Sequence, residues 1–365
     1  MMRCPISFSL SFCMRFRQPE GYRTSYSMRS LLILLAAVAL TCLSDCRRFD
    51  KADPPSPEMA ECLARFKSIP EIAHFQKAAS KAPESPVSDG RPLEGMELAL
   101  TLNGTIASHM DPQADEDDLC YTENTPENFH KLLDALRRTE MPPTVAFVIG
   151  RYLDAELQQE WLASGNLLGN MTFNARAAAK GSPEKFIADI ERLEAAMSPL
   201  WGRFAPVRKY FRYPELKTPR DTESRVQILG YLQKAGYIVV PATIYAHDDK
   251  FNIAYCVSVA RNERSCANLT KAYFNSILLD TALKARTAAR NLTGADSKQI
   301  LMLWADQLTC DNLEEIIKSF KRMGARFIAL DEALRDPIYT TPGEDGDCVA
   351  MSVIRTVKSQ QEGAE

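Results

Sequence analysis

Histidine is scarce in this chain, which has only four in 365 residues, and the motifs of several common enzyme classes are missing. There is no GxSxG, so the nucleophile elbow of a serine hydrolase is excluded. No GxGxxG follows the first expected strand, which argues against a dinucleotide site. No CxxC pair occurs either, so a zinc finger or a thioredoxin-like redox motif has no support.

An excess of basic residues is also lacking, since the formal net charge is -3. The charge therefore gives no sign of a nucleic-acid partner. The chain is 45% hydrophobic and 25% charged, which is typical of a globular protein. Its length allows one large domain or two small ones.

The first 46 residues contain a candidate export segment, "MRSLLILLAAVALTCLSDC", from Met28 to Cys46. Arg29 precedes an apolar run of 13 residues, Leu31 to Leu43, which is short for a membrane span but suits a signal peptide. We predict that residues 1–46 direct export, with a short anchor or a buried helix as the alternative. Cleavage before Cys46 would allow a lipid anchor, although "LSD" is a poor lipobox. The expected location is periplasmic, or on a membrane only through the signal or lipid anchor.

Six cysteines remain after residue 46, and an even number in an oxidising compartment permits disulfides. Cys256 and Cys266 are the closest pair, so they are the predicted bridge. Isolated core cysteines are the alternative.

Apolar strands alternate with amphipathic helices from residue 96 to 338, preceded by a Pro-, Ser- and charge-rich lead-in at 47–95 and followed by a polar tail at 339–365. This alternation predicts an α/β fold, an irregular (β/α) barrel of about seven parallel strands, with an open doubly wound sheet as the alternative. We expect the lead-in to be a linker and the tail to be flexible. The expected strands are 96–104, 143–150, 166–171, 208–214, 237–244, 299–306 and 325–330, and the expected helices are 125–140, 154–164, 182–197, 222–236, 270–291 and 311–324.

Six segments at or near the expected strand ends resemble the motifs of the polysaccharide deacetylases of the NodB-homology type, in the same order along the chain. "LTLNG" is similar to LTFDD, "GNMTFNA" to GNHTxxH, "FRYP" to FRxP, and "ILMLWAD" to the LLLH strand. "PATIYAHDDKFNIAY" is similar to a segment with an Asp–Trp pair, and "RFIALDEAL" to the closing strand and turn. The resemblance spans residues 96–338 and implies a carbohydrate esterase barrel.

The resemblance also implies a catalytic site that this chain does not reproduce. The family holds a divalent ion such as Zn²⁺ with one Asp and two His, uses a second Asp as general base, and protonates the leaving amine with a late His. Carried over, the base falls on Asn103, the metal ligands on Gly104, Met171 and Ala175, and the late His on Trp304. None of these side chains can do that work, so we expect no metal cofactor and no deacetylation.

Arg212 keeps the position of the FRxP arginine, whose partner in the family is the catalytic Asp. Because its counterpart here is the neutral Asn103, we expect Arg212 to be structural and to pair with another acid near the barrel mouth.

A rewired active site remains an alternative. His247 and Asp248 could form an acid–base pair, and the acidic loop 108–118 with His109 could hold Ca²⁺ weakly, although it lacks the EF-hand spacing. Cys310 has no histidine beside it in sequence, which favours a helix-start or core cysteine over a nucleophile.

Aromatic residues dominate the rest of the expected mouth. They could stack on sugar rings or fill the space left by the metal and the imidazoles, and both interpretations stay open. We expect Trp304 near Met171, in the leaving-group pocket. The predicted function is a catalytically degenerate deacetylase that binds a glycan, such as peptidoglycan, or an envelope protein; an active hydrolase and a pure scaffold are the alternatives. The aromatic candidates are Phe173, Tyr213, Tyr245 and Trp304.

Overall fold

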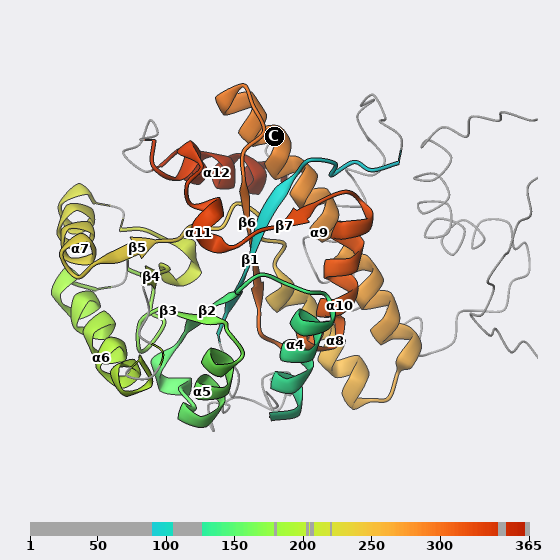
Figure 1. Ribbon diagram of the computed structural model, residues 1–365, viewed down its shortest axis with the longest axis horizontal. Coiled ribbons are helices and arrows are strands. Elements are labelled where there is room, and N and C mark those ends of the chain that lie inside the picture. Colours follow the sequence, from blue (N-terminus) through green and yellow to red (C-terminus); the bar gives the residue numbers. More distant parts are fainter. Residues whose placement is uncertain are drawn as a thin grey trace, which may run out of the picture. The chain divides into compact units, whose positions relative to one another are not determined.

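The computed structural model describes residues 90–104, 126–178, 181–201, 204, 208–219, 221–341 and 348–361. The export segment, most of the lead-in and the 108–118 loop lie outside these residues, so the predictions made for them stay predictions. Figure 1 shows a central sheet with helices packed around it. Within the described ranges, no helix combines the length and the apolar character needed to span a membrane.

Seven parallel strands form one curled sheet in the order β5-β4-β3-β2-β1-β6, with β7 pairing to β1. β6 follows one edge of β1, while β2 and β7 share the other edge, β7 at its start and β2 at its end. Past β5, Ile244 bridges to Leu301 of β6. The predicted α/β fold with a curled parallel sheet is confirmed. The strands are β1 (Glu97–Asn103), β2 (Val145–Val148), β3 (Leu167–Asn170), β4 (Lys209–Phe211), β5 (Tyr237–Val239), β6 (Gln299–Trp304) and β7 (Arg326–Phe327).

The helices begin where the sequence supplies caps. Asp154, Asp221 and Asp306 precede α5, α7 and α10, and each side chain accepts a backbone N–H of the first turn. Pro126 and Pro183 open α4 and α6, as predicted. The helices are α4 (Pro126–Arg138), α5 (Ala155–Ala163), α6 (Pro183–Trp201), α7 (Thr222–Lys234), α8 (Asp248–Ala260), α9 (Arg264–Thr293), α10 (Gln307–Arg322), α11 (Leu330–Ala333) and α12 (Val349–Gln361), with short 3₁₀ turns η2 (Gly150–Tyr152), η3 (Pro214–Leu216) and η4 (Pro337–Tyr339).

Side chains alternate between the two faces of the sheet, as a two-residue period requires. Leu98, Leu100 and Leu102 of β1 pack in the outer core beneath the helices. Ala99 belongs to a second, inner cluster with Phe147 of β2 and Met302 of β6. By the same alternation Thr101 and Asn103 face inward, so the curled sheet encloses polar side chains at its carboxyl end.

Two segments are more ordered than the sequence suggested. Residues 245–269, for which no helix was expected, contain α8, whose Phe251, Ala254 and Tyr255 are buried against the core. The expected flexible tail is wrong for residues 349–361, because α12 buries Val353 and Val357 and packs on α9. α8 carries apolar residues on several sides and so shows no clear helical period, while in α12 the buried valines lie among polar neighbours.

The predicted Cys256–Cys266 bridge is wrong. Cys256 is a thiol that donates from Sγ to Asn252 Oδ1 at 3.4 Å, one turn earlier in α8. Cys266, at the start of α9, is disulfide-bonded. Closeness in sequence was a poor guide, because the Cys256 side chain bonds to Asn252 within its own helix.

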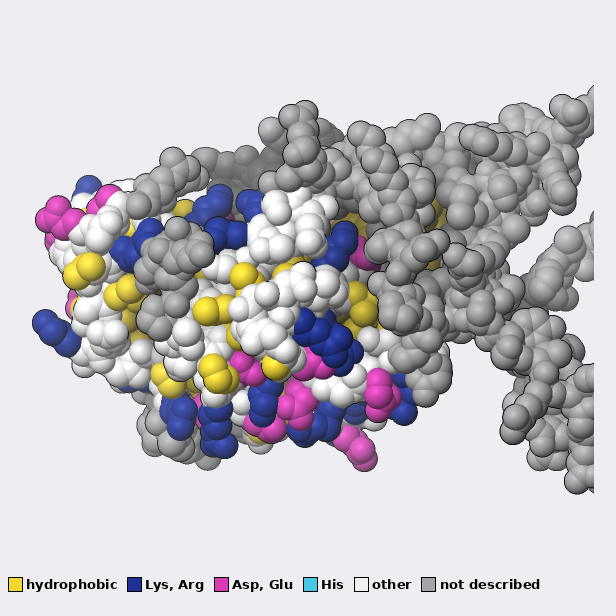
Figure 2. All heavy atoms as spheres, turned by 90° about the horizontal axis from the view of Figure 1, so that it is seen from above, with side chains coloured by type: hydrophobic (Ala, Val, Ile, Leu, Met, Phe, Trp, Pro, Cys, Tyr) yellow, Lys and Arg dark blue, Asp and Glu magenta, His cyan; other side chains and the backbone are white. Residues whose placement is uncertain are grey.

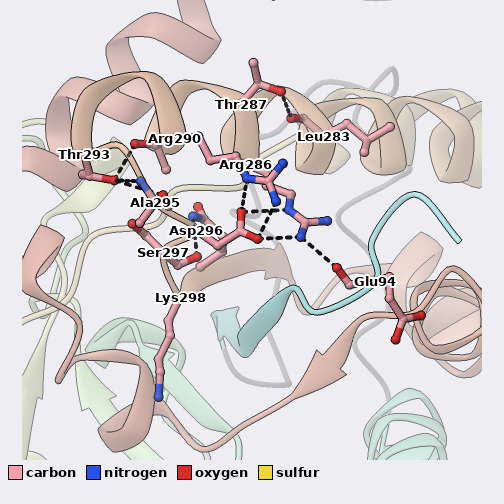
Figure 3. Close-up of polar contacts among 12 residues, drawn as sticks. Glu94, Leu283, Arg286, Thr287, Arg290, Thr293, Ala295, Asp296, Ser297 and Lys298 are labelled. Atoms are coloured by element: carbon pink, nitrogen blue, oxygen red, sulfur yellow. Dashed lines mark hydrogen bonds and ion pairs between the residues drawn. The ribbon is translucent and has the colours of Figure 1, made fainter. Parts of the chain in front are cut away.

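The domain begins before residue 96, since the lead-in is fastened to the barrel (Figure 3). Arg286 of α9 donates to Asp296 at 2.9 and 2.6 Å, and to the carbonyls of Pro92 at 3.1 Å and Glu94 at 2.7 Å. The hydrogen bond from Arg286 is the main cause that lowers the pKa of Asp296 to about 2.

Figure 2 shows the face of the molecule seen from above the view of Figure 1, where basic and acidic side chains are interspersed.

Candidate functional site

The carboxyl ends of β1 and β4 meet in a buried polar network centred on Arg212. Its Nη1 donates to Asn103 Oδ1 at 2.8 Å, its Nη2 to Thr101 Oγ1 at 2.9 Å, and its Nε to the carbonyl of Val240 at 3.2 Å. The guanidinium also lies over the Phe147 ring, 4.1 Å from its centroid. Arg212 therefore contacts the residue at the family's catalytic-base position.

The expected acid partner of Arg212 is not found among the described residues, where its hydrogen-bond acceptors are all neutral. Arg212 is 0% exposed, and burial lowers the pKa of its guanidinium to about 9. It still carries its charge at neutral pH, so among the described residues this buried cation has no carboxylate bonded to it. Such a site favours a carboxylate at position 103.

The positions matched to the metal ligands and to the late His lie together in an apolar setting. Met171 is 1% exposed and shares the inner cluster with Trp304 and Ala175. The Trp304 ring borders Gly104, where a Cβ would lie 3.7 Å from Cε3. The described part of the chain contains no group of three or more His, Cys, Asp or Glu side chains placed to hold a metal ion. These residues do not fit the ion of the family, and His109 lies outside the described residues.

The backbone at and beside these positions has an unusual conformation. Gly104, Thr172 and Ala175 have φ of 66°, 65° and 53°, in the left-handed region. Only glycine enters this region freely, Asp and His tolerate it better than most, and a β-branched residue such as threonine is an outlier there. Thr172 is held by its own bonds, because its N–H donates to Asn170 Oδ1 at 2.8 Å and its Oγ1 accepts the N–H of Ala175 at 3.0 Å.

Two of the four aromatic candidates do not offer a ring face to a ligand. Tyr213 is 4% exposed and stacks on Phe186 at 6.0 Å between ring centroids, so it is a core residue. Phe173 is covered by the guanidinium of Arg192, 3.6 Å from its ring centroid, and its backbone N–H donates to the carbonyl of Asp189. The sequence placed both correctly near strand ends but could not show which way they turn.

Tyr245 and Trp304 remain as half-buried rings beside one another. The Tyr245 hydroxyl donates to Asp249 Oδ1 at 2.6 Å, and the His247 ring lies 4.4 Å from the Tyr245 ring. Burial, and then the charges of Asp248 and Asp249, hold the pKa of Tyr245 far above its usual range, while a hydrogen bond with the Trp304 side chain acts in the opposite sense. The two rings form a polar-rimmed aromatic pair.

The alternative acid–base pair is not available in this arrangement. Asp248 is 0% exposed, and its Oδ2 accepts the N–H of Trp304 at 2.5 Å, so it cannot contact a substrate. Cys310 is buried as well, and burial raises the pKa of its thiol well above the usual value, which fits a core cysteine. Asp306, which caps α10 beside these residues, was not singled out from the sequence.

The chain is similar to several solved structures at low sequence identity. One is a chitin deacetylase from the fungal pathogen Colletotrichum lindemuthianum, with 20% identity, a TM-score of 0.43 and coverage of 70% of this chain and 91% of that chain. Another is the Xyl-CE4 domain of a multidomain xylanase from the hindgut metagenome of Trinervitermes trinervoides, with 16% identity, a TM-score of 0.40 and coverage of 66% of this chain and 90% of that chain. A third is a CE4 family pseudoenzyme from Bacillus anthracis, with 13% identity, a TM-score of 0.41 and coverage of 70% of this chain and 71% of that chain. No curated protein matches the chain.

The family comparison covers one part of the barrel. Residues 117–233 match the model of the family described as polysaccharide deacetylase. This range holds Met171, Ala175 and Arg212 but neither Asn103 nor Trp304. Over residues 117–233, therefore, the chain is similar to polysaccharide deacetylases at the level of the family.

Proposed function

We propose that this protein is a polysaccharide deacetylase-like protein that has lost the catalytic metal site and binds a glycan without turning it over. The observation that carries the proposal is Met171, which is 1% exposed and packed with Trp304 in one apolar cluster. In the family a metal-binding imidazole would stand at that position. A thioether buried among apolar groups does not hold a hard divalent ion.

Glycan binding is supported by the surviving aromatic pair. Tyr245 and Trp304 are half-buried rings with polar groups at their rim, an arrangement that suits a sugar ring stacked on one face and hydrogen-bonded at its edge. The candidate ligands are N-acetylated polysaccharides such as peptidoglycan or chitooligosaccharides. An envelope protein as partner is the alternative outcome.

Binding should be measured by calorimetry with chitooligosaccharides and peptidoglycan fragments. Trp304→Ala is expected to weaken binding by about 0.5–1.5 kcal/mol, the value of a lost aromatic contact, which is at most roughly a tenfold loss. Trp304→Phe should keep most of the affinity, and Val226→Ala, an exposed apolar residue on α7, should change nothing. Equal affinities for the parent and Trp304→Ala would remove the aromatic pair from the proposal.

We further propose that the protein is exported, on the strength of the apolar run from Leu31 to Leu43 behind Arg29. The mature chain is then expected to start near Cys46, with or without a lipid on that cysteine. Intact-mass spectrometry of protein from the native cell tests this. A mass that includes residues 1–45 would contradict export by cleavage.

A further inference from the structure

Two buried carboxyl groups, those of Asp248 and Asp306, bond to Thr309 in the first turn of α10, close to the end of β6. Asp248, the first residue of α8, accepts the N–H of Trp304 at 2.5 Å and the hydroxyl of Thr309 at 3.5 Å through Oδ2. Asp306, the cap of α10, accepts the N–H of Thr309 at 2.9 Å through Oδ1. Both carboxyl groups therefore bond to the same residue.

Each carboxyl group also has one oxygen that is buried and has no hydrogen-bond partner within the described residues: Asp248 Oδ1 and Asp306 Oδ2. Buried polar atoms are nearly always hydrogen-bonded, because leaving one unpaired costs roughly 1–3 kcal/mol. Carboxylates can only accept, so two ionised groups could not satisfy each other. A protonated carboxyl gains an O–H donor, which one group can offer to the other.

The groups around Asp248 and Asp306 favour neutralisation of these carboxyl groups by a proton over pairing with a cation. Asp249 on α8 acts on both carboxyl groups, and Cys310 on α10 senses the charge of Asp306. Tyr245, in the chain before α8, senses Asp248. The cation acting on Cys310, Lys131 of α4, is paired with Asp311 at 2.8 Å. Burial is the main cause that raises the pKa of both Asp248 and Asp306, and the charge of Asp306 adds to it at Asp248.

We propose that Asp248 and Asp306 share one proton, and that this proton latches the N-terminus of α8 to the end of β6. The latch is separate from the proposed glycan function, since it needs no ligand. A second tie at the same junction, from the N–H of Leu308 to Asn252 Oδ1 at 2.9 Å, does not titrate. Losing the shared proton therefore loosens only the first residues of α8.

The sign of the pH effect follows from the raised pKa values. Each group binds its proton more tightly in the folded than in the unfolded protein, so its contribution is full below the unfolded pKa and is lost as the pH rises through the folded pKa. The urea midpoint of the parent should therefore fall between pH 5 and pH 9. Asp306→Asn keeps the helix cap and supplies a permanent N–H donor, so its midpoint should stay level over that range and exceed the parent's at pH 9.

Asp221→Asn is the matched control, because Asp221 caps α7 in the same way and its pKa is lowered, mainly by the backbone N–H of Ser224. Its profile between pH 5 and pH 9 should parallel the parent's. Carbon-13 NMR of the aspartate carboxyl groups in the parent counts directly how many of them stay protonated at each pH. This measurement does not depend on whether a variant folds. The proposal is overturned if all aspartates ionise near their ordinary pKa, or if Asp306→Asn retains the parent's pH profile.

Discussion

Asn103→Asp is expected to stabilise the protein by about 1–3 kcal/mol at pH 7, the range for a hydrogen bond to a charged group in a buried site. The aspartate would give Arg212 a counter-charge that no described residue supplies, 2.8 Å from Nη1, in a side chain of nearly the same shape. Among the described residues, the bond given up is the weak one from Asn103 Nδ2 to Met302 Sδ. The measurement is urea unfolding at pH 7.

The gain should depend on pH in a defined direction. The guanidinium lowers the pKa of the new carboxyl group below its unfolded value of about 3.9, so the gain is present above that value and is lost as the pH falls through the folded pKa. Asn170→Asp is the matched control, since Asn170 is equally buried at the end of β3, where its Nδ2 donates to the carbonyl of Ile190 and to the Tyr237 hydroxyl. That change should destabilise. A loss of stability in both variants would mean that Arg212 is already compensated.

Metal binding should be created by four simultaneous changes: Asn103→Asp, Gly104→Asp, Met171→His and Ala175→His. Positions 104 and 175 already have the left-handed backbone that Asp and His tolerate. We expect Zn²⁺ binding of about 8 kcal/mol, a micromolar dissociation constant, by calorimetry. Met171→His alone should bind no Zn²⁺, because one imidazole makes no site.

Trp304→His is expected to be needed in addition for turnover. The Trp304 ring borders the space that the carboxylate introduced by Gly104→Asp would enter, and indole cannot protonate a leaving amine. The variant with all five changes should therefore bind Zn²⁺ more tightly than the variant with four. If neither binds Zn²⁺, the loops have moved away from a metal-binding geometry.

The sequence predicted the strands well because their patterns are strong. Leu98 to Leu102 and Gln299 to Leu303 are nearly continuous apolar runs, as parallel strands buried on both faces require. The strand expected at 325–330 is present as β7, although only two residues pair. α8 was not expected, because its apolar residues lie on several sides and leave no clear period. The motif order located Asn103, Met171, Arg212 and Trp304 in the structure at the strand ends where the resemblance put them.

Side-chain direction in the loops was beyond the reach of the sequence. Tyr213 packs in a third core cluster with Phe186, and Phe173 lies under Arg192, because packing partners from α6 decide their rotamers. The carboxyl pair of Asp248 and Asp306 joins residues 58 positions apart, and neither neighbourhood shows a periodic signal that would bring them together. The acid expected beside Arg212 was inferred from charge balance alone. In the structure, a buried contact between the guanidinium and the Phe147 ring supplies part of the stabilisation that an acid would give.

The most direct test of the loss of catalysis is acetate release from N-acetylated chitooligosaccharides and peptidoglycan fragments by the parent protein, with Zn²⁺, Co²⁺ or Mn²⁺ added. The general base and the general acid each contribute about 10²–10⁴-fold, so losing both costs roughly 10⁴–10⁸-fold before the metal is counted. We predict no release above the buffer rate with any of the three ions. Metal-dependent release that EDTA abolishes would contradict the account and would place a working metal site in the chain.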